Sequence, residues 1–167
     1  MDDTGVIVIT YTTVYRKGGH QFPLVADTLA REKKQGGFAG EIMSRAVESK
    51  REVLKIFAEI RAAGKTISEF HFVGHSGMYG PMFGTVAFPE QFSPYEWETM
   101  EIPFSKGASA YFHCCRSARW FAPFFARTFN VRAYGFFWYT TFSRSKKRYL
   151  YAGTDGASTL YTIGCKG

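Results

Sequence analysis

The sequence contains few cysteines and no long hydrophobic run. Three cysteines, two of them adjacent, make a poor disulfide framework, so we expect reduced thiols and a cytoplasmic location. No apolar run approaches the roughly 20 residues that a membrane-spanning helix needs. The acidic start, MDDTGVIVITY, lacks the basic residues and the cleavage site of a secretory signal. We therefore expect neither a membrane span nor export.

Acidic residues are nearly missing from the C-terminal part of the chain. Residues 101–167 contain ten Lys or Arg but only Glu101 and Asp155, whereas residues 1–100 are close to neutral. Such a one-sided charge attracts anions, which include nucleic acid, phosphorylated small molecules and acidic polypeptides. A solvated basic face without a partner is an equally good interpretation.

What the chain does contain predicts one globular domain over residues 1–167. Apolar residues make up 46% and aromatic residues 18% of the sequence, enough to build a core without disulfides or metals. Strands are expected at 5–11, 69–73, 108–115 and 131–142. Helices are expected at 24–34, 41–63 and 117–129, with a kink or an end at Pro123. Residues 78–106 are expected to be mostly loop with one helical turn near 94–100, and 148–164 to form a β-hairpin that turns at 155–156. This alternation predicts an α/β fold with a mainly parallel sheet.

Two of the expected strands end in reactive side chains. FHFVG is followed by His75, and AYFHC is followed by Cys115, 40 positions later. Ligands of parallel sheets bind beyond the carboxyl ends of the strands, so adjacent strands would bring both side chains to one edge. An imidazole is the usual base for a thiol nucleophile. A helix starting at Ser117 and the neighbouring Arg116 and Arg119 would give the sulfur an electropositive surrounding.

The turn after His75 could supply the rest of a catalytic site. Ser76 and Gly77 permit a tight backbone there. The backbone N–H groups of Ser76 and Cys115 could then hold a developing oxyanion. Cys114 should face away from Cys115 by strand alternation, and we expect it to be buried and unreactive.

The stretches FHFVGHSG and HCCRSA resemble the two catalytic elements of the caspase-like cysteine peptidases, which include caspases, metacaspases and toxin autoprocessing domains. The resemblance covers roughly residues 66–130. It implies a caspase-like three-layer sandwich, a Cys115–His75 dyad and thiol-dependent cleavage of a polypeptide. Ser76 stands where the family usually has glycine. His113 replaces an acidic residue that metacaspases use to select basic substrates, so no basic preference is implied.

The same resemblance suggests an anionic activator. In toxin autoprocessing peptidases, a basic C-terminal flap binds an inositol phosphate. Here the cluster RSKKR provides Arg144, Lys146, Lys147 and Arg148 as possible anion-binding residues.

Three alternatives remain open. VGHSGMYG nearly matches the GxSxG motif of α/β-hydrolases, which would make Ser76 the nucleophile with an acid from residues 90–101 and His113. The arginines and aromatic residues of 116–149 could bind nucleic acid, although many of these rings also fit a core. A zinc site of His71, His75, His113 and cysteines is disfavoured, because adjacent cysteines share one metal poorly and no CxxC spacing exists. We therefore expect no metal.

Overall fold

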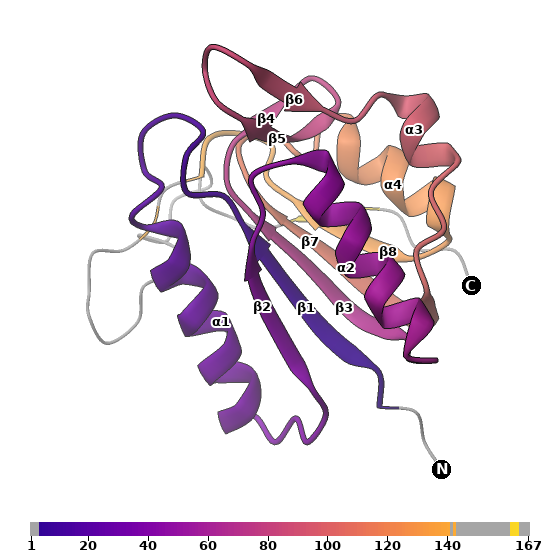
Figure 1. The fold of residues 1–167 in the computed structure, drawn as a ribbon. Helices are drawn as coiled ribbons and strands as arrows, with labels where there is room; N and C mark the ends of the chain where they lie inside the picture. Colours follow the sequence, from indigo (N-terminus) through magenta and orange to yellow (C-terminus); the bar gives the residue numbers. More distant parts are fainter. Residues whose placement is uncertain (1–3, 141, 143–160, 164–167) are drawn as a thin grey trace.

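We describe the fold from a computed structural model of the chain, which covers residues 4–140, 142 and 161–163. Within these residues the central sheet has the order β2-β1-β3-β7-β8-β9 (Figure 1). The first five of these strands are parallel, and β9 is antiparallel to β8. The strands are β1 (Val6–Tyr11), β2 (Ile42–Ala46), β3 (Ile67–Val73), β7 (Phe104–His113), β8 (Arg132–Gly135) and β9 (Tyr161–Ile163). The predicted α/β fold with a mainly parallel sheet is confirmed.

Helices cover both faces of this sheet, which gives a layered arrangement compatible with a three-layer sandwich. Along β1, Val6 and Val8 belong to one hydrophobic core and Ile7 and Ile9 to another, as strand alternation requires. The helix α1 (Phe22–Gln35) closes the second core and confirms the helix expected at 24–34. The first core is closed by α2 (Lys50–Ala62), α3 (Pro94–Glu98) and α4 (Phe121–Phe129).

The single helix expected over residues 41–63 is wrong in its first part. Residues 42–46 form β2, which pairs in parallel with β1 along the edge of the sheet. The helix begins only after Ser49, whose side chain accepts a hydrogen bond of 3.2 Å from the backbone N–H of Glu52. A serine N-cap with Glu three positions later is a helix start signal, and it marks the boundary that apolar spacing missed.

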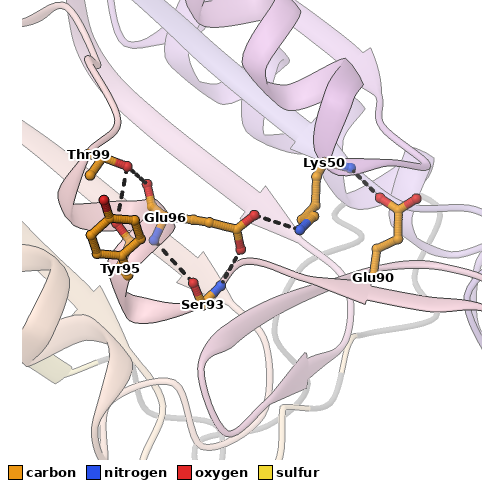
Figure 2. Close-up of polar contacts among 6 residues, drawn as sticks. All are labelled: Lys50, Glu90, Ser93, Tyr95, Glu96 and Thr99. Carbon is orange, nitrogen blue, oxygen red and sulfur yellow. Dashed lines mark hydrogen bonds and ion pairs between the residues drawn. The ribbon is translucent and has the colours of Figure 1, made fainter.

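The segment expected to be mostly loop contains a small antiparallel sheet. Its strands are β4 (Ser76–Gly77), β5 (Gly80–Gly84) and β6 (Pro89–Gln91). The expected helical turn is present as α3, which Ser93 and Glu96 start with a reciprocal capping box. Figure 2 shows how Lys50 joins these parts: its N–H donates to Glu90 and its ammonium to Glu96, at 2.8 and 2.7 Å.

Pro123 neither kinks nor ends the last helix. The helix α4 begins at Phe121, so Pro123 lies in the first turn, where its missing N–H needs no partner. The expected start at Ser117 is therefore wrong by four residues. The helix ends at Phe129, and its C-cap Asn130 adopts the left-handed conformation with φ of 53°.

The C-terminal predictions are only partly covered by the structure. The strand expected at 131–142 is limited to β8. Most of the expected hairpin, including its turn at 155–156, lies outside the described residues, and β9 is its only described part. None of the helices in the described ranges is both long and apolar enough to cross a membrane.

Candidate active site

A cleft lies at the carboxyl ends of β3 and β7, the two central neighbours of the sheet. Val73 and His113 are register partners at the ends of these strands, so His75 and Cys115 each lie two residues beyond the last pair. The cleft has a volume of about 730 Å³. It is lined by Arg16, His75, Ser76, Gly77, Met78, Cys115, Arg116, Arg119, Trp120 and Tyr139. The two residues that the sequence singled out for catalysis thus line one cleft.

The imidazole of His75 is held by the loop that connects β1 with α1. Its Nε2 lies 2.7 Å from the backbone carbonyl oxygen of Lys17. A carbonyl can only accept, so Nε2 carries the hydrogen and Nδ1 is the unprotonated nitrogen of the neutral ring. Tyr15 and Phe22 contact the same ring edge-on, with centroids 5.9 and 5.4 Å away. These contacts fix both the tautomer and the orientation of the ring.

Cys115 lies half-buried in the turn that follows β7. Its sulfur accepts a hydrogen bond of 3.3 Å from the backbone N–H of Thr140. Within the described residues it makes no hydrogen bond to His75, a looseness that is common in nucleophile–base pairs before substrate binds. The next residue, Arg116, has a positive φ of 58°, which turns the chain sharply. Because α4 starts at Phe121, the expectation that the sulfur lies at a helix N-terminus is wrong.

Ser76 connects the two strand ends directly. Its hydroxyl donates a hydrogen bond to the backbone carbonyl oxygen of Cys115. The backbone of Ser76 belongs to β4, where it is the register partner of Pro81. The oxyanion role assigned to the N–H groups of Ser76 and Cys115 stays a prediction.

Cys114 is fully buried, as expected. Burial raises the pKa of its thiol to about 12, although hydrogen bonds with Ser76 and Ser117 act in the opposite direction. A thiol with this pKa is protonated at neutral pH, and only the thiolate is strongly nucleophilic. Of the adjacent pair, Cys115 is the one with access to the cleft.

Residues 136–140, which we call the aromatic strap, run beside the turn that carries Cys115. The backbone N–H of Arg116 donates to Trp138, and that of Ala118 donates to Phe136, at 2.8 and 2.9 Å. The buried Ser117 hydroxyl accepts from the N–H of Phe136 and thereby fastens the strap to the end of β7. The exposed rings of Trp138 and Tyr139 remain at the surface.

Three arginines give the cleft a positive lining. The guanidinium of Arg116 stacks on Tyr139 at 4.8 Å and donates to its hydroxyl. That of Arg119 stacks on Trp138 at 4.3 Å and donates to the carbonyl of Phe137 at 2.7 Å. Arg16 lies over Tyr15 at 5.3 Å. No Asp or Glu lines the cleft, and in the part of the chain that the structure describes these arginines form no ion pair.

A buried polar chain on the α1 face of the sheet was missed by the sequence analysis. His71 Nε2 donates to Glu69 at 3.0 Å, which leaves His71 Nδ1 to accept from His113 Nε2 at 3.0 Å. Lys33 contacts the same carboxylate at 2.8 Å, and the Tyr111 ring stacks on His71. Alternation in the stretch EFH places Glu69 and His71 on one face of β3, and that signal could have revealed half of this buried polar chain.

Burial and neighbouring groups set the protonation states of the three titratable residues in this buried polar chain, Glu69, His71 and His113. Burial lowers the pKa of His71, against the opposing effect of Glu69. Burial, with smaller electrostatic effects of His71 and Lys33, puts the pKa of His113 well below its ordinary value. Burial alone would raise the pKa of Glu69, but its hydrogen bonds to His71 and Lys33 outweigh this and hold it at about 2. The histidines are therefore neutral and the carboxylate is charged at neutral pH.

Apart from Ser76, the other predicted site residues lie outside the described residues or outside the cleft. Arg144, Lys146, Lys147 and Arg148 lie outside the described residues, as does Cys165. For the serine-hydrolase alternative, the Ser76 hydroxyl is bonded to Cys115 and His113 is buried against His71. The acids Glu90 and Glu96 contact Lys50, and Glu101 contacts Arg61. These placements give that alternative no support.

Among the residues with described positions, no group of three or more His, Cys, Asp or Glu side chains is arranged to hold a metal ion. In comparisons with protein-family models and with curated proteins, the chain matches none.

Proposed function

We propose that the chain is a thiol-dependent hydrolase of peptide bonds with Cys115 as nucleophile and His75 as base. The observation that carries this proposal is that two adjacent parallel strands deliver a thiol and an imidazole to one open cleft. It agrees with the resemblance of both strand ends to the caspase-like cysteine peptidases. Cys114 is a poor candidate for the same role because it is buried.

The tautomer of His75 determines the proton path of the proposed reaction. Nδ1 takes the thiol proton as the sulfur attacks the substrate carbonyl, while Nε2 keeps its hydrogen and donates it to the Lys17 carbonyl in a hydrogen bond. The resulting imidazolium gives its proton to the leaving amine as the C–N bond breaks and a thioester forms. Water then hydrolyses the thioester, with its proton passing through Nδ1, and restores the free thiol. Backbone N–H groups of Ser76 and Cys115 would hold the negative oxygen during both steps.

The arginines of the cleft favour a substrate with negative charge near the scissile bond. Arg16, Arg116 and Arg119 line the cleft without a carboxylate beside them. Arginine binds carboxylates with two parallel hydrogen bonds, and such charged bonds contribute about 1.5–3 kcal/mol each. An acidic polypeptide segment fits this lining better than a basic one.

The test combines a thiol-reactive peptide probe with three variants. Wild-type protein and Cys114→Ala should be labelled at Cys115, whereas Cys115→Ala should be unlabelled and should lose cleavage of a peptide library. In His75→Ala, labelling of Cys115 should be slower by about 10²-fold or more, because a general base usually contributes that much to the rate. Retained cleavage in Cys115→Ala, together with its loss in Ser76→Ala, would contradict the proposal in favour of a serine enzyme.

A second candidate function is binding of nucleic acid without catalysis. It is favoured by the exposed rings of Trp138 and Tyr139, each stacked with an arginine, since such pairs also stack on bases. Phe121, Phe125 and Phe136 are buried and belong to the core instead. A salt titration of single-stranded DNA binding tests this candidate: absence of binding at low salt excludes it.

A further inference from the structure

The loop that orients His75 is compact and closes on itself. This loop, residues 12–21, follows β1 and contains both Arg16 and the Lys17 carbonyl that binds the imidazole. Gly19 passes directly over Thr13, and a Cβ atom on Gly19 would lie 1.9 Å from the Thr13 carbonyl oxygen. Tyr15, at the centre of the loop, is only 6% exposed. A shift of Thr13 would therefore move the whole loop.

Glu48 fixes this loop at Thr13. Its Oε1 accepts from the backbone N–H of Thr13 at 2.8 Å and from the Thr13 hydroxyl, and its Oε2 accepts from the N–H of Val14 at 3.3 Å. Among the described ion pairs Glu48 takes part in none, so these donors are what its carboxylate holds.

The backbone of Glu48 is itself firmly placed. Its carbonyl oxygen accepts from the N–H of Gly84 in β5 at 2.8 Å. The preceding residue, Val47, donates to the carbonyl of Tyr11 at the end of β1 at 2.8 Å. The following residue, Ser49, is the N-cap of α2. The carboxylate therefore projects from a rigid point where a strand, a helix and the small sheet meet.

We infer that Glu48 is a positioning residue for the dyad, an inference that rests on the proposed function. Its carboxylate holds Thr13 and Val14, the closed loop transmits that position to the Lys17 carbonyl, and the carbonyl keeps the hydrogen on Nε2 of His75 and Nδ1 free as the base. Hydrogen-bonded carboxylates of this kind act through orientation, and small misplacements of a base are costly to catalysis. Glu48 itself touches neither the sulfur nor the cleft.

The experiment uses Glu48→Gln in the full chain, with Glu90→Gln as the matched control. Glutamine keeps the size of the side chain, but its NH₂ group would face the N–H of Thr13 or Val14. Both groups are donors, so that hydrogen bond would be lost. Glu90 also accepts from a backbone N–H at the start of α2, that of Lys50 (Figure 2). Within the described residues Glu90 has no hydrogen bond to residues 12–21. Both variants lose one carboxylate near the same helix, so an effect on α2 alone would appear in both.

Two readouts are measured. Nitrogen-15 NMR of histidine-labelled protein reports the tautomer of His75, and mass spectrometry follows alkylation of Cys115 by iodoacetamide from pH 5.5 to 8.5. We expect the Nε2–H tautomer in wild type and Glu90→Gln, and a mixture of tautomers in Glu48→Gln. Alkylation in Glu48→Gln should be slower by about tenfold at pH 6.5, with an altered pH profile.

The outcomes separate this inference from the proposed function. An unchanged His75 tautomer in Glu48→Gln, or the same change in Glu90→Gln, overturns the positioning role. Equal alkylation of Cys115 in wild type and His75→Ala overturns the thiol–imidazole pair instead. If Glu48→Gln does not fold, Thr13→Val removes only the hydroxyl donor and must shift the tautomer in the same direction, or the inference fails.

Discussion

The hydroxyl of Ser76 donates a hydrogen bond to the carbonyl oxygen of Cys115, and this bond joins the two loops that carry the proposed catalytic pair. The residues are 39 positions apart in the chain but follow neighbouring strands. A serine in this position connects the loops through its side chain, a role that glycine could not fill. The departure from the glycine of the caspase-like pattern therefore has a structural use.

Removal of this hydroxyl should affect the thiol more than the fold. We expect Ser76→Ala to lower the free energy of unfolding by about 1 kcal/mol, the usual net contribution of one hydrogen bond. Alkylation of Cys115 should slow by about tenfold, because the turn that holds the sulfur loses a constraint. Urea unfolding and alkylation kinetics measure the two effects.

Ser105→Ala is the control for this prediction. The Ser105 hydroxyl donates to the carbonyl of Ile67 at 3.2 Å, between the same two strands at their opposite end. The variant Ser105→Ala should lower the free energy of unfolding by a similar amount and leave the alkylation rate of Cys115 unchanged. Equal alkylation rates in both variants would show that the Ser76 bond does not order the site.

The buried His71–His113 pair should make stability fall on acidification. Both histidines have pKa values below the ordinary 6.5 in the folded protein, so below that pH the unfolded chain binds more protons. Stability is then full above pH 6.5 and declines below it by up to about 1.4 kcal/mol per pH unit for each histidine. The low pKa of Glu69 acts in the same direction below pH 4.5, as that carboxylate must be protonated.

Urea unfolding between pH 4.5 and 8 measures this dependence. His113→Gln should flatten the decline between pH 6.5 and 5, because one of the two groups no longer titrates. An identical slope for wild type and His113→Gln would contradict the prediction.

Arg119 should contribute to the choice of substrate. With the proposed peptidase activity, we expect wild type to cleave library peptides with Glu near the scissile bond faster than their Gln counterparts. Arg119→Gln should reduce this preference by about tenfold, since one charged hydrogen bond is lost. Arg132, exposed and bonded to the carbonyl of Gly107 outside the cleft, is the control. A preference that survives in Arg119→Gln but not in Arg132→Gln would contradict this role.

The capping box of α3 should support the small sheet beside the cleft. Ser93→Ala removes the side chain that accepts from the N–H of Glu96, so we expect a loss of about 1 kcal/mol in unfolding free energy. Ser44→Ala, at an exposed position of the edge strand β2, should change stability by less than about 0.5 kcal/mol. Thermal unfolding of both variants measures the difference.

The parts of the site that follow a strand could be predicted from the sequence. Alternation and apolar runs located β3 and β7, and parallel pairing then placed His75 and Cys115 at one edge. The partner of His75 could not be foreseen, because the backbone carbonyl of Lys17 lies 58 positions away and has no residue signature. The start of α4 was misjudged, since apolar spacing continues through the turn at 115–120.

The edge strand β2 and the polar contact between β3 and β7 were also not predicted from the sequence. The apolar residues of β2 fit helical spacing as well as a strand, so β2 was merged with α2, although the N-cap Ser49 marks where the helix begins. The His71–His113 contact depends on the register of β3 against β7, which a single sequence does not contain.

The register between β3 and β7 determines where His75 and Cys115 leave the sheet. Sliding one of these strands by a single residue would move every side chain to the opposite face of the sheet and into the wrong core, so the separation of sulfur and imidazole is fixed together with the sheet. The loop at 12–21 and the aromatic strap then hold the imidazole and the sulfur in place through backbone groups, the Lys17 carbonyl and the Thr140 N–H. Under the proposed function, we therefore expect a change of substrate preference from side-chain substitutions in these two segments that keep their backbone contacts to His75 and Cys115.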